Sequence, residues 1–342
     1  MISHWLPKYG FLPWGAYGVT FFFVLSGYLI SSNLLYLKQS IDNKEISIPN
    51  AFKFFYIRRT LRIFPLYYLA ILLAYLLVRP VFAGHLFWYV TYLPNILMFR
   101  EKAWPAMLSH FWSLGVEEQF YLMWPFLIFL VKERWLKYLF PIAILVSIGF
   151  KALVYLYHDS FFYTALPWAN FDAFGVGALL AYLPFSRFRP VILEKIPFLW
   201  GFLFFTILSI VAHVTGLIFL LGIFISGGSF FIIRKAQTNF TGLSGKILDL
   251  PAIQYLGKIS YGLYVYHNFM PWLWRCLTGA EDRYPLPIVL STKSWLHKPI
   301  FALSAEFILL VVIASLSWYF VEKPFNNLKG LLKQKPRPVL VT

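Results

Sequence analysis

Nine apolar segments follow one another along the chain, each close to the 17 to 25 residues that a helix needs to cross a bilayer. They span residues 15–37, 61–78, 112–131, 136–157, 165–184, 197–214, 216–233, 255–275 and 299–320. A stub at residues 1–6 precedes them, and no internal repeat or low-complexity segment is present. The pattern predicts an all-α fold, a polytopic transmembrane helix bundle embedded in a lipid bilayer.

The composition agrees with this fold class. Of the 342 residues, 60% are hydrophobic and only 13% charged, a balance that excludes an ordinary water-soluble domain. The net charge of +16 could indicate nucleic-acid binding, but the basic residues cluster between the apolar segments. Anionic lipid and membrane topology explain such clusters better, so no nucleic-acid partner is predicted.

The distribution of basic residues predicts the orientation. Residues 38–62, 132–137, 187–195, 234–258 and 323–337 carry 21 of the 30 lysines and arginines. Basic residues accumulate in cytoplasmic loops, so these segments and the C-terminus are expected in the cytoplasm. The apolar start lacks a basic region ahead of it, and no cleavable signal peptide is expected.

Several kinds of site are excluded or disfavoured by what the sequence lacks. Cys276 is the single cysteine, which rules out an intramolecular disulfide and a thiolate metal cluster. His85, His110, His158, His213 and His297 lie at loop edges without metal-ligand spacing, so no metal site is predicted. Neither a P-loop nor a dinucleotide fingerprint occurs.

Two adjacent carboxylates, Glu117 and Glu118, stand near the start of segment 112–131. An ionised carboxylate in hydrocarbon costs several kcal/mol, so they belong either in the headgroup region or in a polar cavity. At 1.5 Å per residue, Glu117 lies ~7 to 8 Å below the outer start of the segment. Glu118 is expected at the interface. Asp172, His267 and Glu306 are further ionisable groups inside apolar segments.

Three arginines, Arg58, Arg59 and Arg62, stand at the cytoplasmic mouth of segment 61–78. On a helix, residues three and four apart share a face, and arginines so placed can clamp a nucleotide pyrophosphate. The alternative is an anchor that binds lipid phosphate.

Other polar residues have both a packing and a functional interpretation. Ser26 and Gly27 are small residues that allow close helix approach, which favours packing. Tyr261 and His267 suit a sugar site or polar relay as well as an aromatic belt. His4 fits an interfacial residue, or a base that meets Glu117 as its orienting carboxylate.

Five phrases, in this order, resemble acyltransferase family 3, the bacterial integral-membrane O-acyltransferases. They are GVTFFFVLSGYLI, RRTLRIFPLYY, FWSLGVEEQFYLMWP, LGKISYGLYVYH and SWYFVEKPF. The resemblance runs from about His4 to Leu328 and implies about ten transmembrane helices in a bacterial cytoplasmic (inner) membrane. The expected organisation is one acyltransferase domain over residues 1–328 and a short basic cytoplasmic tail over 329–342.

The family moves an acyl group, commonly acetyl from acetyl-CoA, to a hydroxyl of a carbohydrate such as O-antigen, exopolysaccharide or peptidoglycan. The resemblance therefore implies acyl-CoA and a carbohydrate as substrates and no permanently bound cofactor or metal. The family has a full first helix ahead of its histidine, whereas three residues precede His4, so this helix is expected to be truncated.

The resemblance also implies site residues. The family's essential histidine matches His4, the glutamate of its WSLxxE phrase matches Glu117, and its paired arginines match Arg59 and Arg62, with Arg58 adjacent. The residues expected to line the site are Ser26, Gly27, Trp112, Ser113, Tyr121, Asp172, Tyr261 and His267.

The sequence is compatible with two mechanisms. In the first, the arginines hold CoA while His4, oriented by Glu117, deprotonates the acceptor. Because these groups are predicted on opposite faces of a core ~30 Å thick, either a shared cavity or an acyl-histidine relay must join them. In the second, the protein is a transporter or flippase of a lipid-linked saccharide, with Asp172, His267 and Glu306 as its relay.

Overall fold

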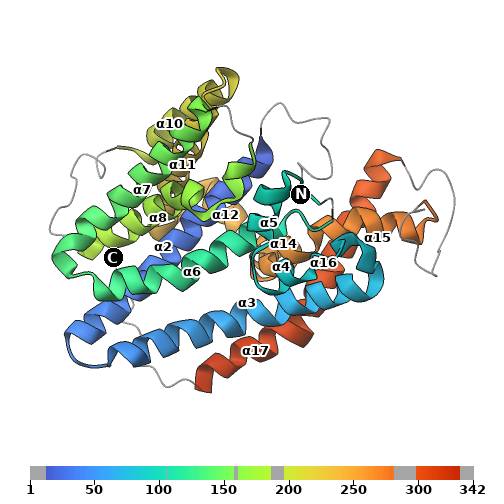
Figure 1. Ribbon diagram of the computed structural model, residues 1–342, viewed down its shortest axis with the longest axis horizontal. Helices are drawn as coiled ribbons and strands as arrows, with labels where there is room; N and C mark the ends of the chain where they lie inside the picture. Colours follow the sequence, from blue (N-terminus) through green and yellow to red (C-terminus); the bar gives the residue numbers. More distant parts are fainter. Residues whose placement is uncertain (1–12, 106, 158–160, 186–195, 281–297, 332–342) are drawn as a thin grey trace.

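The computed structural model describes residues 13–105, 107–157, 161–185, 196–280 and 298–331 (Figure 1). His4 and most of the basic tail lie outside the described residues. Every regular element in the described ranges is a helix, which confirms the all-α prediction.

The α-helices have the following bounds: α2 Trp14–Asp42, α3 Ile48–Val78, α4 Leu86–Val90, α5 Pro94–Glu101, α6 Phe111–Leu130, α7 Glu133–Leu156, α8 Phe171–Tyr182, α10 Phe198–Val214, α11 Ile218–Gln237, α12 Gly242–Leu248, α13 Pro251–Lys258, α14 Ser260–Tyr266, α15 Met270–Leu277, α16 Pro299–Ser317 and α17 Lys323–Asn327. Short 3₁₀ turns connect several of them, and a π-helical turn, Trp318–Glu322, joins α16 to α17.

Five of the described helical stretches are long and apolar enough to cross a membrane: 14–42, 48–82, 133–156, 218–237 and 299–330. Helix α10 is a shorter apolar helix of 17 residues. Helix α8, with 12 residues, is only ~18 Å long and is almost wholly buried among its neighbours. The chain is thus a multi-pass membrane bundle in which some elements are enclosed by others.

Helix α2 lies at the centre of one half of the bundle, packed against α8, α11, α6 and α3. Its contact with α8 is very close, because a Cβ added at Gly27 would overlap the backbone of Phe174. A Cβ added at Gly177 would likewise overlap the backbone of α2 at Val24. The predicted packing role of Gly27 therefore has a direct structural basis.

Helix α3 begins at Ile48, so the predicted start at residue 61 is wrong. Lys53 and the three arginines lower the local hydropathy and hide the first turns of the helix. The helix nevertheless continues through them, since Arg59 and Arg62 face a cavity and Arg59 lies over aromatic rings.

The predicted segments 165–184 and 255–275 are also interrupted. Helix α8 starts at Phe171, after 3₁₀ turns over Phe161–Ala165 and Pro167–Asn170. Segment 255–275 divides into α13, α14, a 3₁₀ turn at His267–Phe269, and α15. Pro271 cannot donate to the carbonyl of His267, which disfavours a continuous α-helix there.

Two hydrophobic cores organise the bundle. One joins α2, the first half of α3, α6, α7, α8 and α11, and the other joins the second half of α3, α4, α5, α14, α15 and α16 with the beginning of α6. Helix α6 contributes to both cores, as the view in Figure 1 shows for its place between α2 and α3. This central position puts its polar residues within reach of both halves.

Candidate active site

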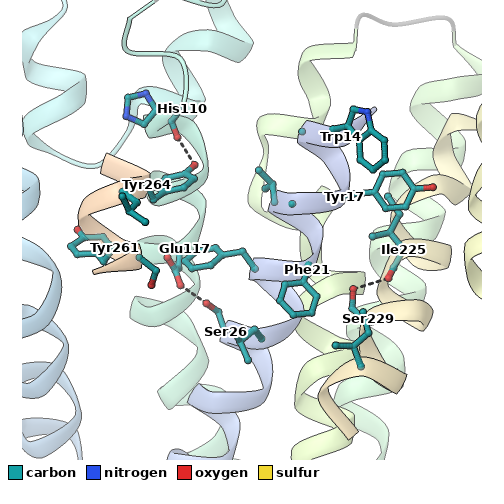
Figure 2. A pocket seen from close by; sticks show the side chains of 18 of the residues that line it. Trp14, Tyr17, Phe21, Ser26, His110, Glu117, Ile225, Ser229, Tyr261 and Tyr264 are labelled. Atoms are coloured by element: carbon teal, nitrogen blue, oxygen red, sulfur yellow. Dashed lines mark hydrogen bonds between the residues drawn. The ribbon is translucent and has the colours of Figure 1, made fainter. Parts of the chain in front are cut away.

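A cavity of about 1440 Å³ lies among α2, α3, α6, α10, α11, α14 and α16 (Figure 2). Its wall is mainly apolar and aromatic, with a small set of polar side chains: Tyr17, Ser26, Arg59, Arg62, His110, Trp112, Glu117, Tyr121, Thr206, Ser209, Ser229, Ser260, Tyr261, Tyr264 and His267. Large apolar cavities with a few convergent polar groups are the usual form of small-molecule sites.

Glu117 is held by two hydroxyl donors at the cavity wall. The hydroxyls of Ser26 and Tyr121 both donate to its Oε1 atom, and the two hydroxyl oxygens lie 3.3 Å apart. Glu117 is only 4% exposed. It therefore faces a polar part of the protein interior, in agreement with the cavity alternative and not with the headgroup alternative.

The three residues come together for simple geometric reasons. Glu117 and Tyr121 are four residues apart on α6 and so share one face of the helix. Ser26 reaches them from α2, which packs against α6, and Figure 2 shows Ser26 and Glu117 pointing toward each other.

A reciprocal amide pair holds α6 against α5. Asn95 Nδ2 donates to Gln119 Oε1 at 3.0 Å, and Gln119 Nε2 donates to Asn95 Oδ1 at 2.9 Å. A Cβ added at Gly115 would lie 2.9 Å from Asn95 Oδ1, so the glycine permits this close contact. These contacts fix the rotation of α6 and thereby the direction in which Glu117 points.

Arg59 connects the arginine motif to this cluster. Its guanidinium carbon lies 5.3 Å from the centre of the Tyr121 ring, and Arg62 lines the same cavity. Of the two ways to join the arginines to Glu117 that the sequence leaves open, a shared cavity is the one that the structure shows. Because α3 begins at Ile48, Arg59 is ~16 Å along the helix and already deep inside the bundle.

The other predicted site residues divide into two groups. Trp112, Tyr261 and His267 line the cavity together with Ser26 and Tyr121. Four predicted residues do not: Arg58, Gly27, Ser113 and Asp172 are absent from its wall. Glu118 is also off the wall and half-buried, and its Oε1 atom is fully buried, which corrects the expectation of an interfacial carboxylate.

Asp172 has a structural partner instead. Lys151 Nζ lies 2.5 Å from Asp172 Oδ2, and Ser147 donates to Oδ1 at 3.0 Å. The pair joins α7 to α8. Of the relay predicted for a transporter, only His267 lines the cavity, since Asp172 and Glu306 do not.

His110 is a cavity residue that the sequence reasoning missed. It is 2% exposed, and its ring centre lies 5.0 Å from that of His267. Its place at the start of an apolar segment suggested a loop edge. The available signal was its spacing, because a residue two helical turns before Glu117 lies on the same face of α6.

No group of three or more His, Cys, Asp or Glu side chains in the described ranges is arranged to hold a metal ion. The cationic and carboxylate groups at the cavity are instead spaced along it. Along α6, His110 lies two turns before Glu117, and Tyr121, whose ring lies beside the Arg59 guanidinium, lies one turn after it. Such a cavity can hold an elongated polyanionic ligand and present its far end to a buried carboxylate.

Comparison with known proteins gives the family. A family model described as "Acyltransferase domain" (Acyl_transf_3) matches residues 1–323. "Peptidoglycan O-acetyltransferase OatA" of Listeria monocytogenes is 29% identical, with 92% of this chain and 51% of the relative covered. "O-acetyltransferase OatA" of Staphylococcus aureus is 28% identical, with 92% and 53% covered.

The chain spans about half the length of the curated relatives it matches. No solved structure matches it significantly. The family match covers both halves of the bundle and every helix that lines the cavity. The chain belongs to acyltransferase family 3.

Proposed function

We propose that the protein is a membrane O-acyltransferase that moves an acyl group, acetyl from acetyl-CoA, to a hydroxyl of a cell-surface or exported carbohydrate. The observation that carries this proposal is the single cavity that contains both Arg59 and Glu117, bridged by Tyr121. The names of the relatives, one of which is a peptidoglycan O-acetyltransferase, support the reaction and the acceptor class.

Arg59 and Arg62 are the proposed donor site. A guanidinium offers a planar array of donors that matches phosphate oxygens, which suits the phosphates of CoA. With the phosphates at these arginines, the pantetheine arm extends along the cavity and brings the thioester toward Glu117. A shared cavity thus supports direct transfer without requiring a covalent relay.

The proposed chemistry combines the Glu117 cluster with His4. His4, the family's essential histidine by resemblance, is the proposed base that accepts the proton of the acceptor hydroxyl, and Glu117 is its proposed orienting carboxylate. The hydroxyl oxygen bonds to the acyl carbon, the carbon–sulfur bond breaks, and the CoA thiolate takes up the proton. Ser26 and Tyr121 keep the Glu117 carboxylate in one orientation.

The membrane setting of the proposal is the bacterial cytoplasmic (inner) membrane, with the C-terminus in the cytoplasm. The arginine end of the cavity then faces the cytoplasmic supply of acetyl-CoA. The opposite end faces the side on which exported carbohydrate is found. This arrangement follows the distribution of basic residues in the loops.

The test is the acyl content of surface polysaccharide and peptidoglycan, measured by mass spectrometry in cells that express the protein. Wild type should add acetyl mass, and Glu117→Gln should lower it about tenfold to a hundredfold, because it removes the carboxylate charge while keeping the shape. Glu133→Gln makes the same change at an exposed position and serves as the control.

Purified protein in lipid nanodiscs should also consume acetyl-CoA when a carbohydrate acceptor is added. A transporter would be indifferent to acetyl-CoA. Carbohydrate movement across the membrane without any acetyl-CoA consumption, with Glu117→Gln as active as wild type, would overturn the proposal.

A further inference from the structure

The last part of the described chain runs along helix α3. The π-helical turn Trp318–Glu322, helix α17 and the 3₁₀ turn Leu328–Leu331 all pack against α3, and Figure 1 shows α17 beside it. The phrase SWYFVEKPF forms the first part of this segment, and none of its residues has a part in the proposed chemistry at Glu117. The segment lies on the same helix that carries the proposed donor site.

Glu322 shows where the segment lies along α3. Its side chain is 4% exposed, and a Cβ added at Gly262 of α14 would lie 3.2 Å from its Oε1 atom. Its carboxylate and the Arg62 guanidinium of α3 attract each other electrostatically. The end of the π-helical turn is therefore fixed between α14 and the arginine motif.

Lys329 brings a further positive charge to the arginine motif. It lies in the 3₁₀ turn that packs on α3 and is half-buried. The charges of Arg62, Arg59 and Arg58 act on it, that of Arg62 most strongly. Arg59 and Arg62 line the cavity, whereas Lys329 does not. Lys329 therefore extends the positive charge of the motif from Arg62 to a place outside the cavity wall.

The ammonium group of Lys329 is oriented by its own segment. Its Nζ atom donates to Asn326 Oδ1. An ammonium has three N–H donors, and this bond uses one of them. Among the described residues it has no other hydrogen-bond partner, so two donors are available to a ligand.

The clustering of these cations favours an anion with more than one phosphate group. Like charges at close range repel each other, and a bound polyanion converts this repulsion into attraction. Hydrogen bonds between cationic side chains and phosphate oxygens are among the strongest in proteins. Lys329 and Arg62 together can therefore bind two phosphate groups of one ligand.

The chemical structure of CoA decides which phosphate lies where. Its pyrophosphate joins the pantetheine arm to the ribose, and the ribose carries a further phosphate at its 3′ oxygen. If the thioester lies at Glu117 and the pyrophosphate at Arg59 and Arg62, the ribose lies beyond the arginines, outside the cavity. Lys329 is the cation beside Arg62 on that side.

We propose that Lys329 binds the ribose 3′-phosphate of the donor and makes the protein prefer acetyl-CoA to acetyl-dephospho-CoA, which lacks that phosphate. This inference rests on the proposed function. It makes Lys329 a binding and specificity-determining residue and Asn326 a positioning residue.

The experiment measures thiol release from acetyl-CoA and from acetyl-dephospho-CoA by the full chain in phosphatidylcholine nanodiscs, with peptidoglycan fragments as acceptor. For wild type, the KM for acetyl-dephospho-CoA should be about tenfold higher, since it lacks a hydrogen-bonded charge pair. Lys329→Met should raise the KM for acetyl-CoA about tenfold and change the KM for acetyl-dephospho-CoA by less than about twofold. The unchanged second KM also shows that the variant is folded.

Two further variants sharpen the result. Lys329→Arg keeps the charge and should keep most of the preference for acetyl-CoA. Lys323→Met makes the same change as Lys329→Met in the same segment, at an exposed lysine 5.7 Å from the centre of the Tyr319 ring, and should leave both KM values unchanged.

Equal KM values for the two donors in wild type, or an undiminished preference in Lys329→Met, would overturn the 3′-phosphate subsite while leaving acyl transfer in place. Lipid headgroups also carry phosphate, so the measurement is repeated with phosphatidylglycerol in the nanodiscs. An effect of Lys329→Met that appears only there, and equally for both donors, would assign Lys329 to lipid and overturn the inference. Release of no thiol from either donor by wild type would instead remove the proposed function.

Discussion

The hydroxyl groups of Ser26 and Tyr121 satisfy one oxygen of a carboxylate that is almost completely removed from solvent. Buried polar groups are stable only when hydrogen-bonded, and a buried carboxylate is the most demanding of them. A site that needs Glu117 in one orientation must therefore keep its two donors. Ser26 was interpreted from the sequence as a packing residue, whereas the structure gives it this polar contact.

Ser26→Ala tests the importance of the donors. It removes one hydrogen bond to Glu117 without adding volume, so we expect acetyl transfer to fall about tenfold, the equivalent of ~1.4 kcal/mol. Ser304→Ala is the control, since Ser304 is exposed and donates to the Ile300 carbonyl of its own helix. Acetyl transfer is measured from labelled acetyl-CoA, and an unchanged rate in Ser26→Ala would contradict a role of the donors.

Arg59→Lys tests the donor site. Lysine keeps the charge but loses the planar fork and the contact over the Tyr121 ring, so we expect the KM for acetyl-CoA to rise about tenfold with a smaller change in kcat. Arg58→Lys, at the neighbouring position off the cavity wall, should have a clearly smaller effect on that KM. Equal effects at both positions would mean that general positive charge, and not the cavity wall, attracts the donor.

Helix α2 contacts α8 through glycines whose missing Cβ atoms leave room for the opposing backbone. Close packing of this kind replaces the hydrophobic driving force that is absent between helices in lipid. It also determines where Ser26 lies, because Ser26 and Gly27 are adjacent and point to different sides of α2. One faces the cavity and the other faces α8.

Gly27→Ala should force α2 away from Phe174 and destabilise the bundle by about 1 to 3 kcal/mol, as overpacking does elsewhere. Thermal unfolding in nanodiscs measures the effect as a lower midpoint. Gly149→Ala, where an added Cβ meets nothing within 4 Å, should leave the midpoint unchanged or raise it slightly. Equal midpoints for the two variants would show that α2 and α8 can separate freely.

The pairing of α7 with α8 depends on an ion pair whose side chains are 7% and 2% exposed. Lys151→Met leaves Asp172 as an uncompensated buried charge and should destabilise the protein by about 3 to 5 kcal/mol. Adding Asp172→Asn to that variant should restore much of the loss, since the remaining charge is removed. A double variant no more stable than the single one would mean that the contribution is packing and not charge.

Across the whole molecule, one cavity joins regions that are far apart in the chain, from α2 to α16. Arg59, Glu117 and His110 follow one another along it, since Arg59 lies at Tyr121, one turn after Glu117 on α6, and His110 lies two turns before Glu117. An elongated donor and a separate acceptor can therefore both reach the Glu117 carboxylate while they remain inside the cavity. This continuity is what makes direct acyl transfer geometrically reasonable in the proposed function.

The amino-acid sequence was enough to predict the all-helical membrane bundle and the positions of most helices, because the length of an apolar segment is a local property of the chain. It was also sufficient to single out Glu117, Arg59 and Tyr121, through phrases that resemble a known family. The prediction from hydropathy was wrong at the start of α3, where the basic side chains lower the average hydropathy of a stretch that is helical. It was also wrong at the break before Pro271, where the proline lacks the N–H that a continuous α-helix needs.

The sequence did not allow us to predict which side chains contact one another. That Arg59 and Glu117 share a cavity, that His110 stands beside His267, and that Asp172 pairs with Lys151 are results of helix rotation and depth. Rotation and depth depend on contacts between residues distant in the chain, such as Gly27 with Phe174. Hydropathy predicts that a helix crosses the membrane. The direction in which each polar side chain faces is determined by the packing of all the helices together.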